Sequence, residues 1–127
     1  MSRPTLDEAI RSFTSGAAVR EGRVKFDISP LVENGNAVPV SVTVESPMTA
    51  DSHVRRIALF NEKNPQADVA VFHLSPRSGR AHVATRIRLA ASQVVVALAE
   101  LSDGTFWIAK ASVIVTLAAC IEDVSKA

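Results

Sequence analysis

The sequence predicts an all-β fold, an immunoglobulin-like antiparallel sandwich of about seven strands with a short N-terminal helix. Apolar and polar residues alternate through most of the chain from residue 23 onward, as in strands with one buried face. Turn-forming residues separate these runs, and no helical crossover recurs between them. The 127 residues, of which 47% are apolar, suffice for one domain with its own core.

The N-terminal segment predicts a helix over about residues 5–15. Thr5 and Glu8 have the spacing of a capping box, in which each side chain bonds the backbone amide of the other residue. An apolar stripe at helical spacing follows: Leu6, Ile10 and Phe13. Gly16 is suited to end the helix. We expect this helix to dock at one end of the domain.

Extended runs follow the helix and define a sandwich over about residues 23–117. The runs are residues 23–28, 38–44, 53–60, 68–74, 81–89, 92–100 and 105–117. Asp103-Gly104 is the clearest hairpin signal between them, because glycine adopts a positive φ at low cost. Residues 94–99 are apolar at every position, which predicts a central strand covered on both faces.

The charge balance and the motifs exclude several classes of protein. Lys and Arg number 14 and Asp and Glu 13, and this near-neutrality argues against a binder of nucleic acid or of anionic membranes. No stretch approaches the roughly 18 apolar residues of a membrane span. No catalytic nucleophile motif, phosphate loop or paired-carboxylate signature occurs, so we expect no catalytic residue and no cofactor. His53, His73 and His82 lie on different predicted strands, so we expect no metal site.

Two further patterns concern partners. The runs at residues 57–60, 69–72 and 94–99 are apolar on both faces, more than a thin sandwich hides, so we expect an uncovered surface that a partner or a second copy occupies. His82, Arg86 and Arg88 alternate with apolar residues and form a basic strip. This strip either binds an anion or a partner's carboxylates, or it is an ordinary solvated face.

The single cysteine, Cys120, excludes an internal disulfide and argues against a classical zinc site. In the last predicted strand, Cys120 shares its side with Lys110, Ser112 and Thr116, so we expect the thiol to point away from the core. Two interpretations remain open from the residues alone: a small buried hydrophobic side chain, or an accessible thiol.

Several stretches of the chain resemble the SoxY family, the sulfur-carrying subunit of the bacterial thiosulfate-oxidising system. These stretches are residues 33–40, 54–65 and 85–88 and the Asp103-Gly104 hairpin. The resemblance implies an immunoglobulin-like sandwich, a SoxZ-like partner in a heterodimer, and a periplasmic location after removal of an export signal that this sequence does not show. It also implies sulfur intermediates carried covalently on Cys120, while separate enzymes load, oxidise and hydrolyse them.

The sequence departs from the family pattern beside the thiol. SoxY-like chains end in a glycine-flanked cysteine, whereas here Ala118 and Ala119 precede Cys120, and Ile121 and Glu122 follow it. The expected arm, residues 118–127 of a single domain spanning residues 1–127, is therefore bulkier and stiffer. Two readings follow: a carrier with differently shaped partner pockets, or a structural or partner-binding domain whose cysteine is inert or paired between molecules.

Overall fold

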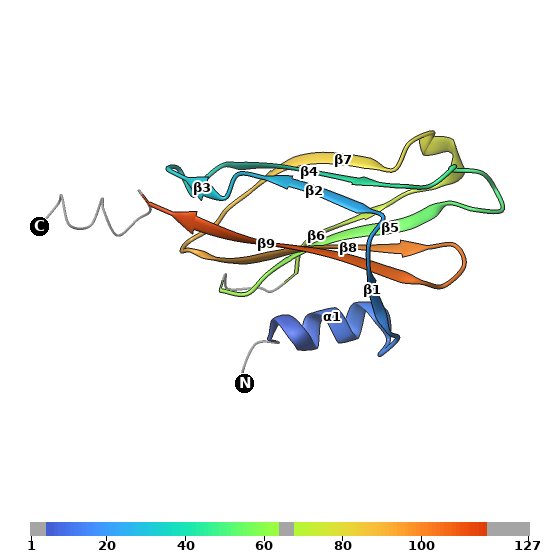
Figure 1. Ribbon diagram of the computed structural model, residues 1–127, viewed down its shortest axis with the longest axis horizontal. Helices are drawn as coiled ribbons and strands as arrows, with labels where there is room; N and C mark the ends of the chain where they lie inside the picture. The colour runs from blue at the N-terminus through green and yellow to red at the C-terminus, as the bar shows by residue number, and fades with distance from the viewer. Residues whose placement is uncertain (1–4, 64–67, 117–127) are drawn as a thin grey trace, which may run out of the picture.

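The computed structural model of the chain describes residues 5–63 and 68–116, except for the side chains of residues 68 and 69. Within these residues it contains one α-helix, nine strands and one 3₁₀ turn (Figure 1). In chain order they are α1 (Leu6–Thr14), β1 (Val19–Glu21), β2 (Val24–Ile28), β3 (Leu31–Val32), β4 (Val38–Val44), β5 (Val54–Asn61), β6 (Asp68–His73), η1 (Pro76–Ser78), β7 (His82–Ile87), β8 (Gln93–Leu101) and β9 (Phe106–Val115).

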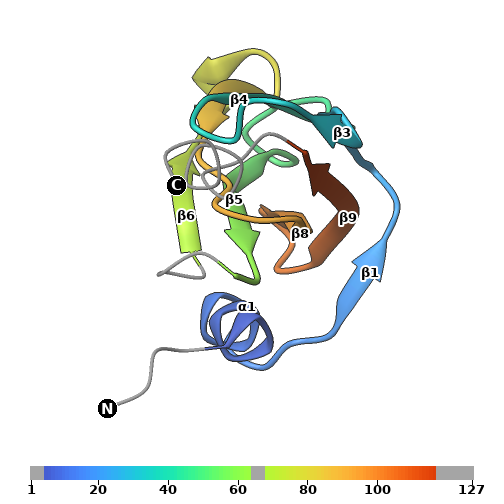
Figure 2. The same ribbon diagram turned by 90° about the vertical axis from the view of Figure 1, so that its left-hand side faces the viewer.

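The elements are arranged in layers, with the larger sheet between α1 and the smaller sheet (Figures 1 and 2). The larger, six-stranded sheet has the order β1-β9-β8-β5-β6, and β3 pairs with β9 outside this path. The smaller sheet has the order β2-β4-β7. The predicted β-sandwich with an N-terminal helix is confirmed, and each of the expected extended runs contains a strand.

The alternation in the sequence explains the core between the sheets. In β4 the valines at positions 38, 40, 42 and 44 are at most 4% exposed, whereas Pro39 faces outward. Ile57 and Leu59 of β5 and Val95 of β8 meet this layer from the larger sheet. Fully burying a side chain of this size contributes about 1.5–3 kcal/mol, so this interface is the main source of stability.

Helix α1 begins where the sequence predicts, but it packs at a different place in the domain from the one expected. The capping box is present, with Thr5 Oγ1 accepting from the amide of Glu8 at 3.2 Å and Glu8 Oε1 accepting from the amide of Thr5 at 3.2 Å. The helix ends at Ser15, whose φ of 55° is left-handed, just before Gly16. The prediction that it docks at one end of the domain is wrong. Instead it lies along the outer face of the larger sheet (Figure 2).

The position of α1 corrects the expectation of an uncovered apolar face for β5 and β8, whereas Val71 in the run at residues 69–72 remains 40% exposed. Ala58, Phe60, Val96 and Leu98 point away from the sandwich core and are at most 2% exposed, because α1 covers them. The prediction that residues 94–99 form a strand covered on both faces is confirmed. The surplus apolar surface on β5 and β8 therefore packs against the chain's own helix and needs no partner.

Phe13 and Arg56 join α1 to the larger sheet. The Phe13 ring packs edge-on against Phe60 and Phe106, with ring centroids 5.8 and 6.0 Å away. The Arg56 guanidinium lies 3.9 Å from the centroid of the Phe13 ring and donates to the Phe13 carbonyl at 3.2 Å. Arg56 Nε also pairs with Glu100 at 2.6 Å. One arginine thus stacks on the helix's aromatic anchor and occupies a carbonyl near the helix's C-terminal end.

The sequence reading missed β1 and β3. Both run parallel to β9, so the sheet is not purely antiparallel, and the strands begin at Val19 rather than at residue 23. Their three and two residues are too few to show a period, and their partner is distant in the sequence.

We predict that Phe13→Ala lowers the free energy of unfolding by about 2–3 kcal/mol, because it removes the aromatic anchor of α1 from a half-buried position. Urea denaturation measures this change. Ser12→Ala, an exposed neighbour on the same helix, is the control and should stay within about 0.5 kcal/mol. Equal stabilities for the two variants would contradict this account of helix docking.

Candidate functional site

The end of β9 determines where the chain's single thiol can be. Cys120 lies four residues after Thr116, the last residue that the structure describes. The predicted arm residues Ala118, Ala119, Ile121 and Glu122 also fall outside the described residues. An extended chain spans at most about 3.6 Å per residue, so the Cα of Cys120 stays within about 14 Å of the Cα of Thr116. We call residues 113–116 the arm root.

Strand β3 holds the arm root along one edge. Leu31 pairs with Ile114 and Val32 with Val115 in parallel register. The amide of Ile114 donates to the Pro30 carbonyl at 2.8 Å, and the amide of Thr116 donates to the Val32 carbonyl at 2.9 Å. Regular pairing therefore continues to within four residues of the cysteine.

Strand β8 and the residues before it hold the other edge. Gln93 pairs with Val113, and Ser92 Oγ accepts from the amide of Val115 at 2.8 Å. Gln93 is buried; its amide group donates to the Ala91 carbonyl and accepts from the amide of Lys63, both at 2.9 Å. The start of β8 is thus fixed to the end of the β5 segment as well as to β9.

Gly35, in the turn between β3 and β4, packs against the arm root. Its carbonyl accepts from the amide of Leu89 at 2.7 Å. A Cβ at this position would overlap the Leu89 carbonyl oxygen and lie 3.2 Å from Val115 Cγ1. The sequence indicated only a turn here. The structure shows that the turn needs glycine because two backbone segments and the arm root meet at this point.

A buried amide lies at the same end of the sandwich. Asn61, the last residue of β5, is 0% exposed and pairs in register with Val95. Neither of its side-chain polar atoms has a hydrogen-bond partner in the described part of the chain. Leaving a buried amide without hydrogen bonds costs about 1–3 kcal/mol, so Asn61 destabilises this end of the core. Sequence reasoning gave no signal for it, since a single Asn at a strand end is ordinary.

An exposed apolar pair lies beside the arm root. Leu31 and Ile114 are register partners and are 58% and 56% exposed. Val71, on the edge strand β6, is a further large apolar residue with substantial exposure. The surface beside the arm root is therefore suited to contact an apolar partner surface.

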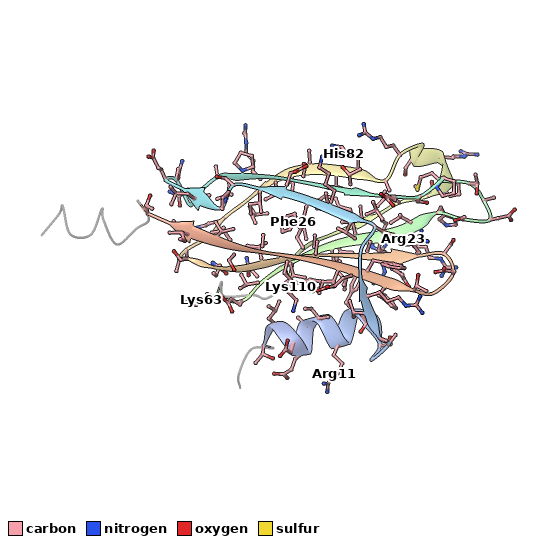
Figure 3. The ribbon with its side chains drawn as sticks, in the orientation of Figure 1. Arg11, Arg23, Phe26, Lys63, His82 and Lys110 are labelled. Carbon is pink, nitrogen blue, oxygen red and sulfur yellow. The ribbon has the colours of Figure 1, made fainter. Side chains whose placement is uncertain are left out.

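The predicted basic strip lies on the outer face of the smaller sheet. His82, Arg86 and Arg88 are exposed, whereas Ile87 and Leu89 between and beyond them are buried, which confirms the predicted alternation. Figure 3 shows His82 on this outer face, above the layer in which Phe26 points between the sheets. His82 Nδ1 lies 2.8 Å from Thr43 Oγ1 of the neighbouring strand.

The three histidines do not converge. His53 Nδ1 lies 3.1 Å from the Thr49 carbonyl oxygen, before β5, while His73 and His82 belong to β6 and β7. Among residues 5–63 and 68–116 there is no group of three or more His, Cys, Asp or Glu side chains that could hold a metal ion. In the same residues no helix is long and apolar enough to cross a membrane.

The predicted hairpin at Asp103-Gly104 is confirmed and lies at the opposite end of β9 from the arm root (Figure 1). The Asp103 carboxylate accepts from Thr105 Oγ1 at 2.6 Å and from the Thr105 amide at 2.9 Å. These hydrogen bonds hold the pKa of Asp103 below its ordinary value. Because the pKa is lowered, the turn is stabilised at neutral pH and loses this contribution as the pH falls through the folded-state pKa.

We predict that Gly35→Ala lowers the free energy of unfolding by about 1–3 kcal/mol, since the added methyl group overlaps the Leu89 carbonyl and forces the backbone apart. Thermal or urea unfolding measures the change. Asn36→Ala, an exposed position in the same turn, is the matched control and should have little effect. A Gly35→Ala protein as stable as this control would show that the turn does not pack against the arm root as described.

Comparison with solved structures gives similar folds. The chain is 27% identical to the sulfur carrier protein SoxY from Chlorobium limicola f thiosulfatophilum, with a TM-score of 0.74 over 87% of this chain and 91% of that one. It also resembles superoxide reductase (neelaredoxin) from Ignicoccus hospitalis, at 22% identity and a TM-score of 0.66 over 90% of this chain and 95% of that one. At this identity the second likeness concerns the fold alone.

The family comparison covers most of the chain. No curated protein matches it. The model of the family described as sulfur oxidation protein SoxY matches residues 10–120, which include α1 from Ile10 onward and every strand described above. The resemblance inferred from the sequence is thereby confirmed, and the chain belongs to the SoxY family.

Proposed function

We propose that this protein carries sulfur intermediates covalently on Cys120 during the oxidation of thiosulfate or related sulfur compounds. One observation carries the proposal: the family match ends at residue 120, the position of the chain's single cysteine. The likeness to a sulfur carrier protein SoxY and the firmly held arm root support it. A single thiol suits this role, because a second one would compete for the cargo or form a disulfide with the first.

The proposed chemistry at the Cys120 thiol has two steps, an oxidative attachment of thiosulfate and a hydrolysis. The Cys120 thiolate forms a bond to the outer sulfur of thiosulfate, and the two electrons released go to an acceptor that a separate redox enzyme supplies. Water then cleaves the bond between the two cargo sulfur atoms, which releases sulfate and two protons and leaves a persulfide on Cys120. In this proposal the chain contributes the attachment point and other enzymes catalyse each step, so the protein itself is not an enzyme and needs no cofactor beyond the covalent adduct.

In this proposal the sandwich is bound by the partner enzymes, and the residues around Cys120 enter their active sites. Strand β3 holds the arm root up to the amide of Thr116 on one edge, and β8 pairs with it up to Val113 on the other. In an enzyme that binds the sandwich, Cys120 would therefore lie within about 14 Å of a fixed point. Ala118, Ala119, Ile121 and Glu122 are larger than the glycines expected from the family pattern. We therefore propose that the enzymes that receive this arm have wider pockets beside the thiol than those that receive a glycine-flanked cysteine.

We also propose a periplasmic location and a SoxZ-like partner, as family membership implies. The exposed pair formed by Leu31 and Ile114 offers an apolar contact for this partner beside the arm root. A partner bound there would leave the outer face of the smaller sheet accessible to the enzymes.

We predict that incubation with thiosulfate, a loading enzyme and its electron acceptor adds the mass of one thiosulfate-derived group to the protein, and that Cys120→Ser abolishes the addition. Intact-mass spectrometry measures both. Ser112→Cys with Cys120→Ser, which moves the thiol to an exposed position within β9, is the control for nonspecific thiol chemistry and should not be loaded enzymatically. An adduct that persists in Cys120→Ser, or a wild-type chain that stays unloaded beside a loaded SoxY control, would refute the proposal.

We predict that the chain forms a heterodimer with a SoxZ-like subunit and that Leu31→Glu weakens it at least about 10-fold, because a charge would be buried in an apolar contact. Light scattering and titration calorimetry measure the mass and the affinity. Val71→Glu, on the distant edge strand β6, is the matched control and should leave the affinity unchanged. A chain that stays monomeric with the partner present contradicts the heterodimer, and an affinity lowered by Val71→Glu alone contradicts the assigned surface.

A further inference from the structure

The outer face of the smaller sheet has no covering element among the described residues. Helix α1 packs on the larger sheet, whereas the far side of β2, β4 and β7 is open (Figures 1 and 2). An open groove lies on this side of the molecule and is lined by residues from all three strands. A protein that binds there contacts the sheet itself.

The strand register explains the form of the groove. Ile28, Val40 and Thr85 pair across the three strands and point toward the core, so their backbone forms the floor. Outward-facing residues flank this floor on both sides. On one side they are Pro39, Arg86 and, just after the end of β2, Ser29; on the other they are Asp27, Ser41 and Ala84. The groove therefore crosses the strands, and its charged lining residues, Asp27 and Arg86, come from its two edge strands.

Arg86 supplies an unused cation at the β7 end of the groove. It is exposed, and in the described part of the chain no hydrogen bond or ion pair joins its guanidinium to another residue. Its cross-strand neighbour is Pro39, and Ala84 precedes it by two residues on the same face. Neither side chain offers an acceptor to the five N–H donors of the guanidinium. A carboxylate from another molecule can therefore bind it in the bidentate geometry that arginine favours.

Asp27 supplies the opposite charge at the β2 end. It is exposed, and Ser41 Oγ donates to its carboxylate at 3.4 Å, which is long for a hydrogen bond between oxygens. Among the described residues no Lys or Arg lies within ion-pair distance of this carboxylate, although Lys25 is two residues away on the same face. The carboxylate is therefore able to accept from a basic side chain of another molecule.

The two charges have a spacing that suits an extended chain. Neighbouring strands lie about 4.8 Å apart, so β2 and β7, on either side of β4, are about 10 Å apart. Three residues of an extended chain span about the same distance, roughly 10 Å. We propose that an extended segment of a partner protein binds across this groove, with a carboxylate at Arg86 and, about three residues away, a basic side chain at Asp27. Both contacts are exposed charge pairs, so this binding is weak and sensitive to salt.

The groove also lies beside the arm root. Ser29, one of its lining residues, precedes Pro30, whose carbonyl accepts from the amide of Ile114. A protein bound in the groove is therefore next to the described residues that are nearest in sequence to Cys120. That this partner is an enzyme acting on the thiol rests on the proposed function, whereas the recognition chemistry of the groove does not.

The recognition chemistry is tested with the full chain and a synthetic hexapeptide of serine in which one glutamate and one lysine stand three positions apart. At low salt the peptide should shift the backbone amide NMR signals of Ser41, Ala84 and Arg86 saturably, and high salt should abolish the shifts. Arg86→Glu should weaken binding at least about 3-fold, because the glutamate then meets a like charge. Arg77→Glu is the matched control, since it makes the same charge change at an exposed position in η1, at the other end of the smaller sheet (Figure 1).

Further probes identify the occupant. The same peptide with glutamine at both charged positions should cause no saturable shift. Asp27→Asn should weaken binding of the charged peptide, because its lysine loses a partner. Equal binding to Arg86→Glu and Arg77→Glu would overturn the proposal. Sodium sulfate that shifts the groove signals as much as the peptide, and more strongly after Asp27→Asn, would show a site for small anions and overturn it equally.

The identity of the partner is tested in the loading reaction with thiosulfate. Arg86→Glu should raise the KM for this protein at least about 3-fold and leave kcat within about 2-fold, because it weakens docking and does not touch the thiol. Arg77→Glu should change neither constant. A KM that Arg86→Glu leaves unchanged would overturn the assignment of the groove to this enzyme. A wild-type chain that is not loaded at all refutes the proposed function instead, and the peptide titration still decides the recognition chemistry of the groove.

Discussion

Strand β9 is held by backbone hydrogen bonds along both edges, and the arrangement of the rest of the molecule depends on this. β8 pairs along one edge; β1 and β3 pair along the other, at the beginning and at the end of the strand. Between β1 and β3 the chain crosses to the smaller sheet, where it forms β2, and then returns to β9 as β3. The same strand therefore joins the helix-covered sheet, the smaller sheet and the arm root. Unpaired, its last residues would extend the arm, and the position of Cys120 would be far less defined.

The sequence predicted the long elements of the fold because their patterns are local. The valines of β4 alternate, residues 94–99 are uniformly apolar, and the capping box at Thr5 and Glu8 is a short-range signal. It did not predict where α1 packs, because an apolar helical stripe fits any apolar face. That placement followed from the outward-facing residues of β5 and β8, which are also apolar. The same surplus suggested a partner, although the chain's own helix satisfies it.

The candidate site was predictable only in part. Family resemblance and strand register indicated Cys120, and the alternation around Arg86 was correct, but the arm itself lies outside the described residues. The arm root could not be read from the sequence. β3 has two residues and therefore shows no period. In the sequence Gly35 is an ordinary turn glycine, and only the structure brings Leu89 and Val115 against it. Such contacts join positions some 50 to 80 residues apart, which a single sequence does not reveal.

The central claim is that the rigid body continues through Thr116, four residues before the thiol. Native-state hydrogen exchange of individual amides tests it most directly, since Ile114, Val115 and Thr116 each donate to a defined acceptor. The account predicts that these amides are strongly protected, within about 10-fold of the protection of Leu98 in the centre of the sheet. If they exchange as fast as the exposed amide of Asp103, the arm begins earlier than Thr116 and the account of the arm root is wrong.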